Sequence, residues 1–353
     1  MYLGAGSGTW RLRRHVTYRV GVRRQNPQFI SCATFAHLIG LLTADTGAQM
    51  TVSLPMPVRE HIRAVFDHAG AEASSRMERA PNTHEESLDM ALIDEIAKRG
   101  VPTGLPDGWI VRIDTHFLGG GRHWRNWEIA DIGALVTIRL AGKPALFKVV
   151  LLQSKRLYPI EIAAKEEKDL VDYEIGFGGL LRGHHSYPAI TQVRQFSFSA
   201  DSQYRALEKG DRQWVAMDEY TQHYNIPLHY LLYHPGHCPL SATVPTSPVT
   251  TESTSEPLGC RVVGQPGMVK ACVDLADGRS PSLGQVLGPA PGSTTFRGFG
   301  LGEFFGDEVL SCREGYIATK ERDSGLDRIF SRRSGPISAA IAVTIDGPGA
   351  RPD

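Results

Sequence analysis

Apolar positions show their clearest periodicity between residues 83 and 236. In THEESLDMALIDEIAKRG, Leu88, Leu92 and Ile96 recur every four residues, acids occupy the first turn, and a lysine, an arginine and a glycine close the segment. This spacing gives one apolar helix face, and these end residues favour helix termini. We therefore predict an amphipathic helix over residues 84–99.

Apolar segments of strand length follow this helix. They alternate with polar residues or form short buried runs, and glycine-rich turns separate them. The predicted strands are 108–117, 128–140 (bent at Gly133), 145–157 and 226–235. A polar helical segment is expected at 161–172, and a helix broken near Gly210 at 202–225.

The predicted order is helix, three strands, helix, strand. We expect the first three strands to form a meander and the last strand to return to the same sheet. Such an order gives an α/β fold with a central mixed sheet flanked by helices. It predicts an α-β-β-β-α-β core with irregular N- and C-terminal extensions.

Composition divides the chain around this core. We predict a basic, partly helical extension over 1–80 with a helix near 57–68, the core domain over 81–240, a linker over 241–258, and a Gly-rich region of unknown fold over 259–353. The linker is expected because nine Ser/Thr and three Pro stand in its 18 positions, a composition that cannot bury a core. Short strands are predicted around 260–274 and 337–345.

Charge and cysteine content restrict the class of protein. Lys+Arg and Asp+Glu both number 38, so net charge indicates no partner, although the first 44 residues carry six arginines and no acid. Five scattered cysteines without a CxxC pair argue against a zinc ribbon or a disulfide framework. Without an apolar run of about 18 residues or a secretory signal, we expect a cytoplasmic protein that makes no membrane contact.

Three polar residues interrupt the apolar strands. Asp131 stands among Ile129, Ile132 and Leu135, where a carboxylate is costly unless it is paired or binds a cation. Gln153 and Lys155 are two residues apart, so they lie on one face of their strand. If the second and third strands are neighbours, Asp131 lies beside Gln153 and Lys155.

This combination of groups suits a hard divalent cation. Mg²⁺ prefers carboxylate, amide-carbonyl and water oxygens. A lysine near such an ion can orient or deprotonate its water, or neutralise charge that develops on a phosphate. The pattern therefore favours metal-assisted phosphodiester hydrolysis, with Mg²⁺ as cofactor and Mn²⁺ as a substitute.

A helix glutamate, an Asp on the second strand and QxK on the third resemble the PD-(D/E)XK nuclease superfamily. ADIGALV and VVLLQSKRL are similar to its Mrr-like restriction endonuclease branch, in which glutamine replaces an acid. The resemblance covers about residues 83–236. It implies a restriction-endonuclease-like fold and an endonuclease that cleaves DNA in restriction or anti-phage defence. It leaves open a homodimer and an activating partner.

The resemblance also implies roles for individual residues. Asp131 would be the central metal ligand, Gln153 the second ligand through its side-chain oxygen, and Lys155 the catalytic lysine. Glu85 shares the face of the apolar helix residues and is preferred as the helix glutamate and third ligand, with Glu86 as its substitute. Outside the motif, Arg156 and Arg125 are candidate nucleic-acid contacts.

Plainer interpretations of the same residues stay open. Asp131 could be a strand-end carboxylate satisfied by backbone N–H groups, and Lys155 and Arg156 could begin a solvated turn before Pro159. Glu85 and Glu86 could be acids that favour the first turn of a helix. Two alternatives to a DNA endonuclease follow: a non-catalytic nucleic-acid-binding or scaffold module on the same fold, or a nuclease that acts on RNA.

Overall fold

A computed structural model describes residues 53–118, 127–162, 194–244, 249–288, 296–318, 323–331 and 335–350. These residues belong to one compact unit, Thr51–Asp353. The region after 259 is therefore part of the same unit as the predicted core. Most of the predicted N-terminal extension lies outside the described residues.

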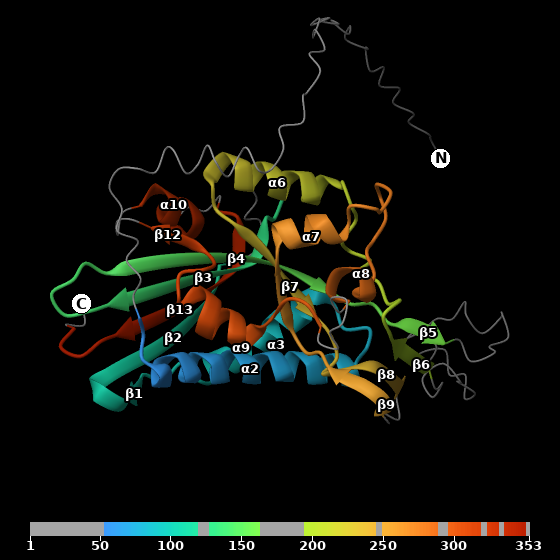
Figure 1. Cartoon of the computed structure of the whole chain (residues 1–353), viewed down its shortest axis with the longest axis horizontal. Helices are drawn as coiled ribbons and strands as arrows, with labels where there is room; N and C mark the ends of the chain where they lie inside the picture. The colour runs from blue at the N-terminus through green and yellow to red at the C-terminus, as the bar shows by residue number, and fades with distance from the viewer. Residues whose placement is uncertain are drawn as a thin grey trace, which may run out of the picture. The chain divides into compact units, whose positions relative to one another are not determined.

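Two long helices cover one face of the central sheet (Figure 1). Helix α2 spans Met56–Arg79 and is longer than the predicted 57–68, while α3 spans Glu85–Ala97 and confirms the predicted 84–99. Leu88, Leu92 and Ile96 are buried, as their spacing predicted. The short helix α9 (Leu301–Glu303) and the π-helical turn η3 (Phe304–Val309) pack against α2 on the same side.

The central sheet is mixed and draws on the whole described chain. Its strand order is β1-β2-β13-β3-β4-β7-β10-β11, and β12 pairs with the start of β4. The strands are β1 Thr103–Leu105, β2 Trp109–Phe117, β3 Ala130–Arg139, β4 Leu146–Arg156, β7 Leu228–Tyr233, β10 Arg261–Gly264, β11 Phe299–Gly300, β12 Tyr316–Ala318 and β13 Ile337–Asp346. The predicted α/β class with a central mixed sheet is confirmed.

The predicted meander is wrong in one place, because β13 separates β2 from β3. It pairs antiparallel with β2 and parallel with β3, while β3 and β4 are antiparallel neighbours and β4 and β7 are parallel. The segment ISAAIAVTID is largely buried. An apolar strand of this kind requires partners on both edges, so it occupies the middle of the sheet.

The opposite face of the sheet carries α6 (Arg212–Tyr224), α7 (Gln265–Ala271) and α10 (Ser324–Leu326) (Figure 1). Helix α6 is shorter than the predicted 202–225. Asp211 caps its N-terminus by accepting from the Trp214 N–H, and Asn225 ends it in the left-handed conformation. Two further short elements are α8 (Leu283–Leu287) and η4 (Asp327–Ser331).

The prediction of a linker over 241–258 is wrong, because this segment belongs to a second, four-stranded sheet. Its order is β5-β6-β8-β9, with β5 Ile160–Ile162, β6 Arg194–Phe198, β8 His237–Val244 and β9 Val249–Pro257. The segment 241–258 thus contributes to two paired strands. Ser and Thr do not form a core, but backbone pairing requires no apolar side chains and Thr favours strands. The predicted helix at 161–172 begins with the end of β5 and otherwise lies outside the described residues.

No helix in the described part of the chain combines the length and the apolar character needed to cross a membrane.

Candidate active site

The Asp131 carboxylate lies at the start of β3, where pairing with β4 ends. The antiparallel register of the two strands stops at Ile132 and Leu152. Beyond this point the Asp131 carboxylate takes the place of a strand partner: Oδ2 accepts from the Ser154 backbone N–H at 2.6 Å. Asp131 therefore stands beside the QxK segment, and it also matches the strand-end carboxylate left open above.

Gln153 reaches the same carboxylate with its amide nitrogen. The distance from Gln153 Nε2 to Asp131 Oδ2 is 2.5 Å. The side chain is buried, and its Oε1 has no hydrogen-bond partner. The structure thus turns the amide nitrogen of Gln153, and not the oxygen predicted as a metal ligand, toward Asp131, because a carboxylate accepts from the N–H end of an amide.

Lys155 and Glu85 bring together β4 and the first turn of α3. The Lys155 ammonium is almost completely buried and lies 3.6 Å from Glu85 Oε2. Glu85 Oε1 also accepts from the Arg156 backbone N–H at 3.0 Å. Glu86 is exposed. Of the two helix glutamates considered from the sequence, Glu85 is the one that contacts the QxK segment.

Asp89 is a further acid of this site that the sequence reasoning missed. Its Oδ1 accepts from Ser154 Oγ at 2.5 Å and from the Tyr233 hydroxyl at 2.6 Å. Asp89 follows Glu85 by four residues, so both acids lie on one face of α3. That spacing was visible in the sequence, and Ser154 now joins Asp89 to Asp131 through its side chain and its backbone.

Burial and neighbouring negative charges raise the pKa values of both aspartates. Burial is the main cause that raises the pKa of Asp89 to about 7, with the charges of Glu85 and Glu86 acting in the same sense. Burial also raises the pKa of Asp131 well above its ordinary value; the nearby Asp89 adds to this rise and the Lys155 charge opposes it. Carboxylates that repel one another in a buried place attract a proton or a cation.

Arg156 has a different role from the predicted nucleic-acid contact. It is buried, and its guanidinium donates to the carbonyls of Thr83 and Pro81, the latter at 2.8 Å. Arg156 therefore attaches the loop between α2 and α3 to the end of β4, and a phosphate cannot reach it. Arg125, the second predicted contact, lies outside the described residues.

The oxygen donors of the site meet the minimum that Mg²⁺ requires from a protein. Mg²⁺ often takes one or two carboxylates and fills its other positions with water and phosphate oxygens. Asp131 supplies a carboxylate, and Gln153 Oε1 is a buried oxygen without a partner. Within the described residues, no group of three or more His, Cys, Asp or Glu side chains is arranged to hold a metal ion. The donor set is thus not an all-carboxylate site, and it fits a lightly coordinated magnesium ion only if the Gln153 amide turns so that Oε1 faces Asp131.

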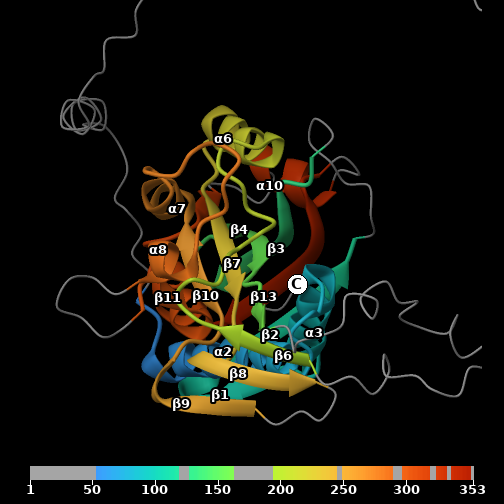
Figure 2. The ribbon, with the colours of Figure 1, turned by 90° about the vertical axis from the view of Figure 1, so that its right-hand side faces the viewer.

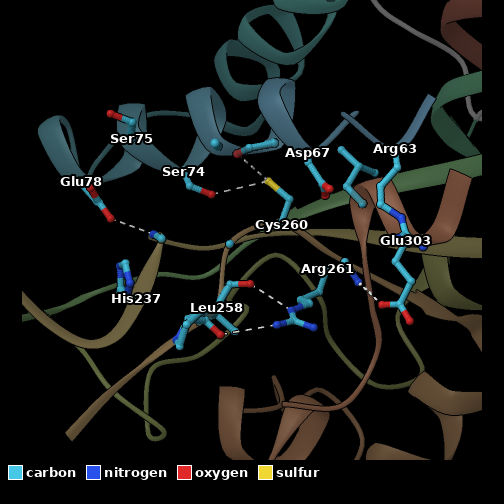
Figure 3. A pocket seen from close by; sticks show the side chains of 17 residues that line it. Arg63, Asp67, Ser74, Ser75, Glu78, His237, Leu258, Cys260, Arg261 and Glu303 are labelled. Carbon is cyan, nitrogen blue, oxygen red and sulfur yellow. Dashed lines mark hydrogen bonds between the residues drawn. The ribbon is translucent and has the colours of Figure 1, made fainter. Parts of the chain in front are cut away.

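A separate open pocket of about 750 Å³ lies between α2 and the segments 236–237, 257–261 and 300–303 (Figure 3). Its polar groups largely bond to one another. Cys260 Sγ donates to the Gly70 carbonyl at 3.3 Å, and Arg261 Nε donates to the Leu258 carbonyl at 2.9 Å. The pocket contains none of the predicted site residues, and its walls indicate no particular ligand.

Comparisons of the chain with protein-family models, with curated proteins and with solved structures find no match.

Proposed function

We propose that this protein is a metal-dependent nuclease that hydrolyses phosphodiester bonds in DNA. The proposal rests on one observation: the start of β3 and the end of β4 bring Asp131, Gln153 and Lys155 together, and α3 adds Glu85. These are the residues of the PD-(D/E)XK pattern. Along the chain, α3, β2, β3, β4, α6 and β7 also occur in the order of a restriction-endonuclease-like core, with β5 and β6 between β4 and α6 and with β13 inserted between β2 and β3 in the sheet.

Asp131 and Gln153 would hold the Mg²⁺ ion, with Mn²⁺ as a substitute. When bound, the ion supplies Lewis acidity toward the phosphate and a water of lowered pKa. Gln153 serves as a ligand only with its amide turned so that Oε1 rather than Nε2 faces the site. Because Asp131 and Asp89 lie close together and are largely desolvated, a cation there also relieves their repulsion.

Lys155 would act on the phosphate or on the attacking water. Its buried ammonium is held between the acids of the site, where a positive charge interacts with a developing oxyanion far more strongly than it does in water. Glu85 orients this ammonium and completes the charge balance of the site. A context in restriction or anti-phage defence is part of the same proposal.

A non-catalytic module on the same fold is the second candidate, and one observation favours it. Hydrogen bonds within the protein already engage one oxygen of each carboxylate: Asp131 Oδ2 accepts from Ser154 and Gln153, and Asp89 Oδ1 accepts from Ser154 and Tyr233. Such a closed network can stabilise the sheet without any cation. The two candidates differ in whether a metal ion can replace hydrogen bonds of this network and bind to the carboxylates.

Plasmid cleavage separates the two candidates. Purified protein should convert supercoiled plasmid to nicked and linear forms with Mg²⁺ or Mn²⁺ and not with EDTA. The variants Asp131→Asn and Lys155→Met should lose this activity. A matched Lys143→Met variant, which changes an exposed lysine in the turn before β4, should keep it. Equal cleavage by all three variants would show that the nuclease lies elsewhere.

RNA remains the alternative substrate. A labelled RNA of the same sequence, added as competitor in the plasmid assay, should leave the rate of DNA cleavage unchanged. Preferential cleavage of the RNA would replace DNA by RNA in the proposal and leave the site assignment intact.

A further inference from the structure

An exposed arginine, Arg205, lies beside the chain that leaves β4. Figure 2 shows β6 in the lower part of the view and α6 at the top, and the segment that carries Arg205 connects them. The backbone N–H of Tyr158, three residues after Lys155, donates to the Gln203 carbonyl at 2.9 Å, and Gln203 in turn pairs with Ser282. This pairing holds the backbone next to Arg205 against the end of the candidate site.

The Arg205 side chain lies over the ring of Tyr158. Its guanidinium carbon is 5.6 Å from the ring centroid, and the guanidinium carbon of Arg156 is 4.1 Å from the same centroid. An aromatic ring attracts a guanidinium in this position and restricts its movement. Arg205 is exposed, whereas Arg156 is buried. Of these two arginines, Arg205 is therefore the one that a ligand in solvent can reach.

The two arginines carry positive charge without a direct acidic partner. In the part of the chain that the structure describes, neither guanidinium forms an ion pair with a carboxylate, and that of Arg156 donates to the carbonyls of Thr83 and Pro81. Burial is the main cause that lowers the pKa of Arg156; the charge of Arg205 adds to this lowering, and that of Glu85 opposes it. The two guanidinium groups thus repel each other, and an anion bound at Arg205 would relieve the repulsion.

The position of Arg205 suits a nucleic-acid strand that passes the candidate active site. Three residues of extended chain separate Lys155 from Tyr158, which corresponds to about 10 Å. The rise along one strand of DNA is about 3.4 Å per nucleotide, so this span equals about three nucleotides. A guanidinium also presents its N–H groups in a geometry that matches phosphate oxygens. A backbone phosphate near the scissile one therefore fits Arg205 in charge and in spacing.

We propose that Arg205 binds a backbone phosphate of the DNA substrate, within about three nucleotides of the phosphate on which Lys155 acts. This inference rests on the nuclease function proposed above. It gives Arg205 the nucleic-acid contact that the sequence suggested for the buried Arg156. Because the contact is to a phosphate and not to a base, it positions the strand without reading its sequence.

DNA binding in EDTA, followed by fluorescence anisotropy, measures this contact separately from cleavage. Arg205→Gln should weaken binding of a labelled duplex of about 20 base pairs about fivefold, and should reduce the slope of log K against log salt by about 0.9, the share of one phosphate contact. Arg205→Lys keeps the charge and should keep the slope of the parent. An arginine with only a structural role would leave the slope unchanged in both variants.

Arg112→Gln is the matched control, because it removes the same charge from an exposed arginine far from the site. Thr344 pairs with Arg112 on β2 and with Thr137 on β3, and Thr137 lies six residues, or about 20 Å, from Asp131. This variant should bind DNA as the parent does.

Two results would overturn the assignment of Arg205: an unchanged slope and affinity in Arg205→Gln, or an equal loss in Arg112→Gln. A parent chain that binds no duplex would overturn it as well. Cleavage of plasmid by the parent in any of these cases would leave the proposed nuclease intact. A parent that binds DNA through Arg205 but does not cleave it would instead confirm the contact and overturn the nuclease.

Discussion

Strand β4 carries two buried lysines that have different surroundings. The Lys148 ammonium donates to the carbonyls of Val309 and Glu314, the latter at 2.8 Å, and so attaches the chain after η3 to the sheet. The Lys155 ammonium, seven residues further along, lies beside Glu85, and its charge acts to lower the pKa of Asp131. Burial alone therefore does not mark a catalytic lysine. Lys148 bonds to two backbone carbonyls and to the Cys312 side chain, and so links the chain after η3 to the sheet. Lys155 lies near the acids Glu85 and Asp131, which a metal ion could also contact.

The largest expected effect is a difference in plasmid cleavage between variants of the two lysines. Lys155→Met should lower the rate of plasmid cleavage by about 10³-fold, since removal of one preorganised electrostatic group typically costs a factor of this size. Lys148→Met should leave the rate per folded molecule within about twofold. Initial rates at saturating Mg²⁺ measure both. A comparable loss in both variants would mean that Lys155, too, acts only through the fold.

The second effect concerns pH and stability at the Lys155 end of the strand. Burial raises the folded-state pKa of Asp89 from 3.8 to about 7, so the folded protein keeps a proton that the unfolded chain has lost. The contribution of this proton to stability is complete below about pH 4 and is lost as the pH rises to 7. The Asp89→Asn variant has no carboxyl group here and so lacks this pH-dependent contribution to stability. Urea unfolding should therefore show the variant gaining stability relative to the parent between pH 4 and 7, and a constant difference would contradict the assignment.

The third effect is the loss of stability in Lys148→Met. The Val309 carbonyl would remain buried without this donor, which costs about 1–3 kcal/mol, and the part-buried Glu314 carbonyl would lose the same donor. The same experiment on Lys143→Met, which changes an exposed lysine, should show a change within about 0.5 kcal/mol. Urea midpoints measure both values. Equal stability of the Lys148 variant and the parent would show that the lysine does not hold the chain after η3.

The smallest effect is expected from Ser154→Ala, which removes the link that Ser154 makes between Asp89 and Asp131. The variant loses the hydrogen bond from Ser154 Oγ to Asp89 but keeps the backbone N–H that Asp131 accepts. We expect about 1 kcal/mol less stability, since Tyr233 still donates to Asp89. Cleavage should fall less than in Lys155→Met. A loss of cleavage as large as that of Lys155→Met would assign Ser154 a direct role in the site.

Local patterns were sufficient to predict the elements that build the candidate site. The four-residue spacing of Leu88, Leu92 and Ile96 located α3, and apolar runs located β3 and β4. The proximity of Asp131 to Gln153 followed from the antiparallel pairing of those strands. Each of these predictions depended on residues close in sequence or on one hairpin.

Long-range pairing and side-chain orientation could not be predicted in this way. The position of β13 between β2 and β3 joins residues more than 200 positions apart, and no local pattern encodes such a pairing. The orientation of the Gln153 amide depends on whether a carboxylate or a cation faces it. The strand character of β9 was hidden because its Ser and Thr side chains suit a linker as well as an exposed edge.

Titration of Mn²⁺ into the protein, followed by calorimetry, tests the central claim most directly: that Asp131 at the start of β3 and the residues at the end of β4 form a cation site rather than a closed hydrogen-bond network. The account predicts one bound ion for the parent and for Lys143→Met, and none for Asp131→Asn. Absence of binding to the parent, or equal binding to Asp131→Asn, would contradict it.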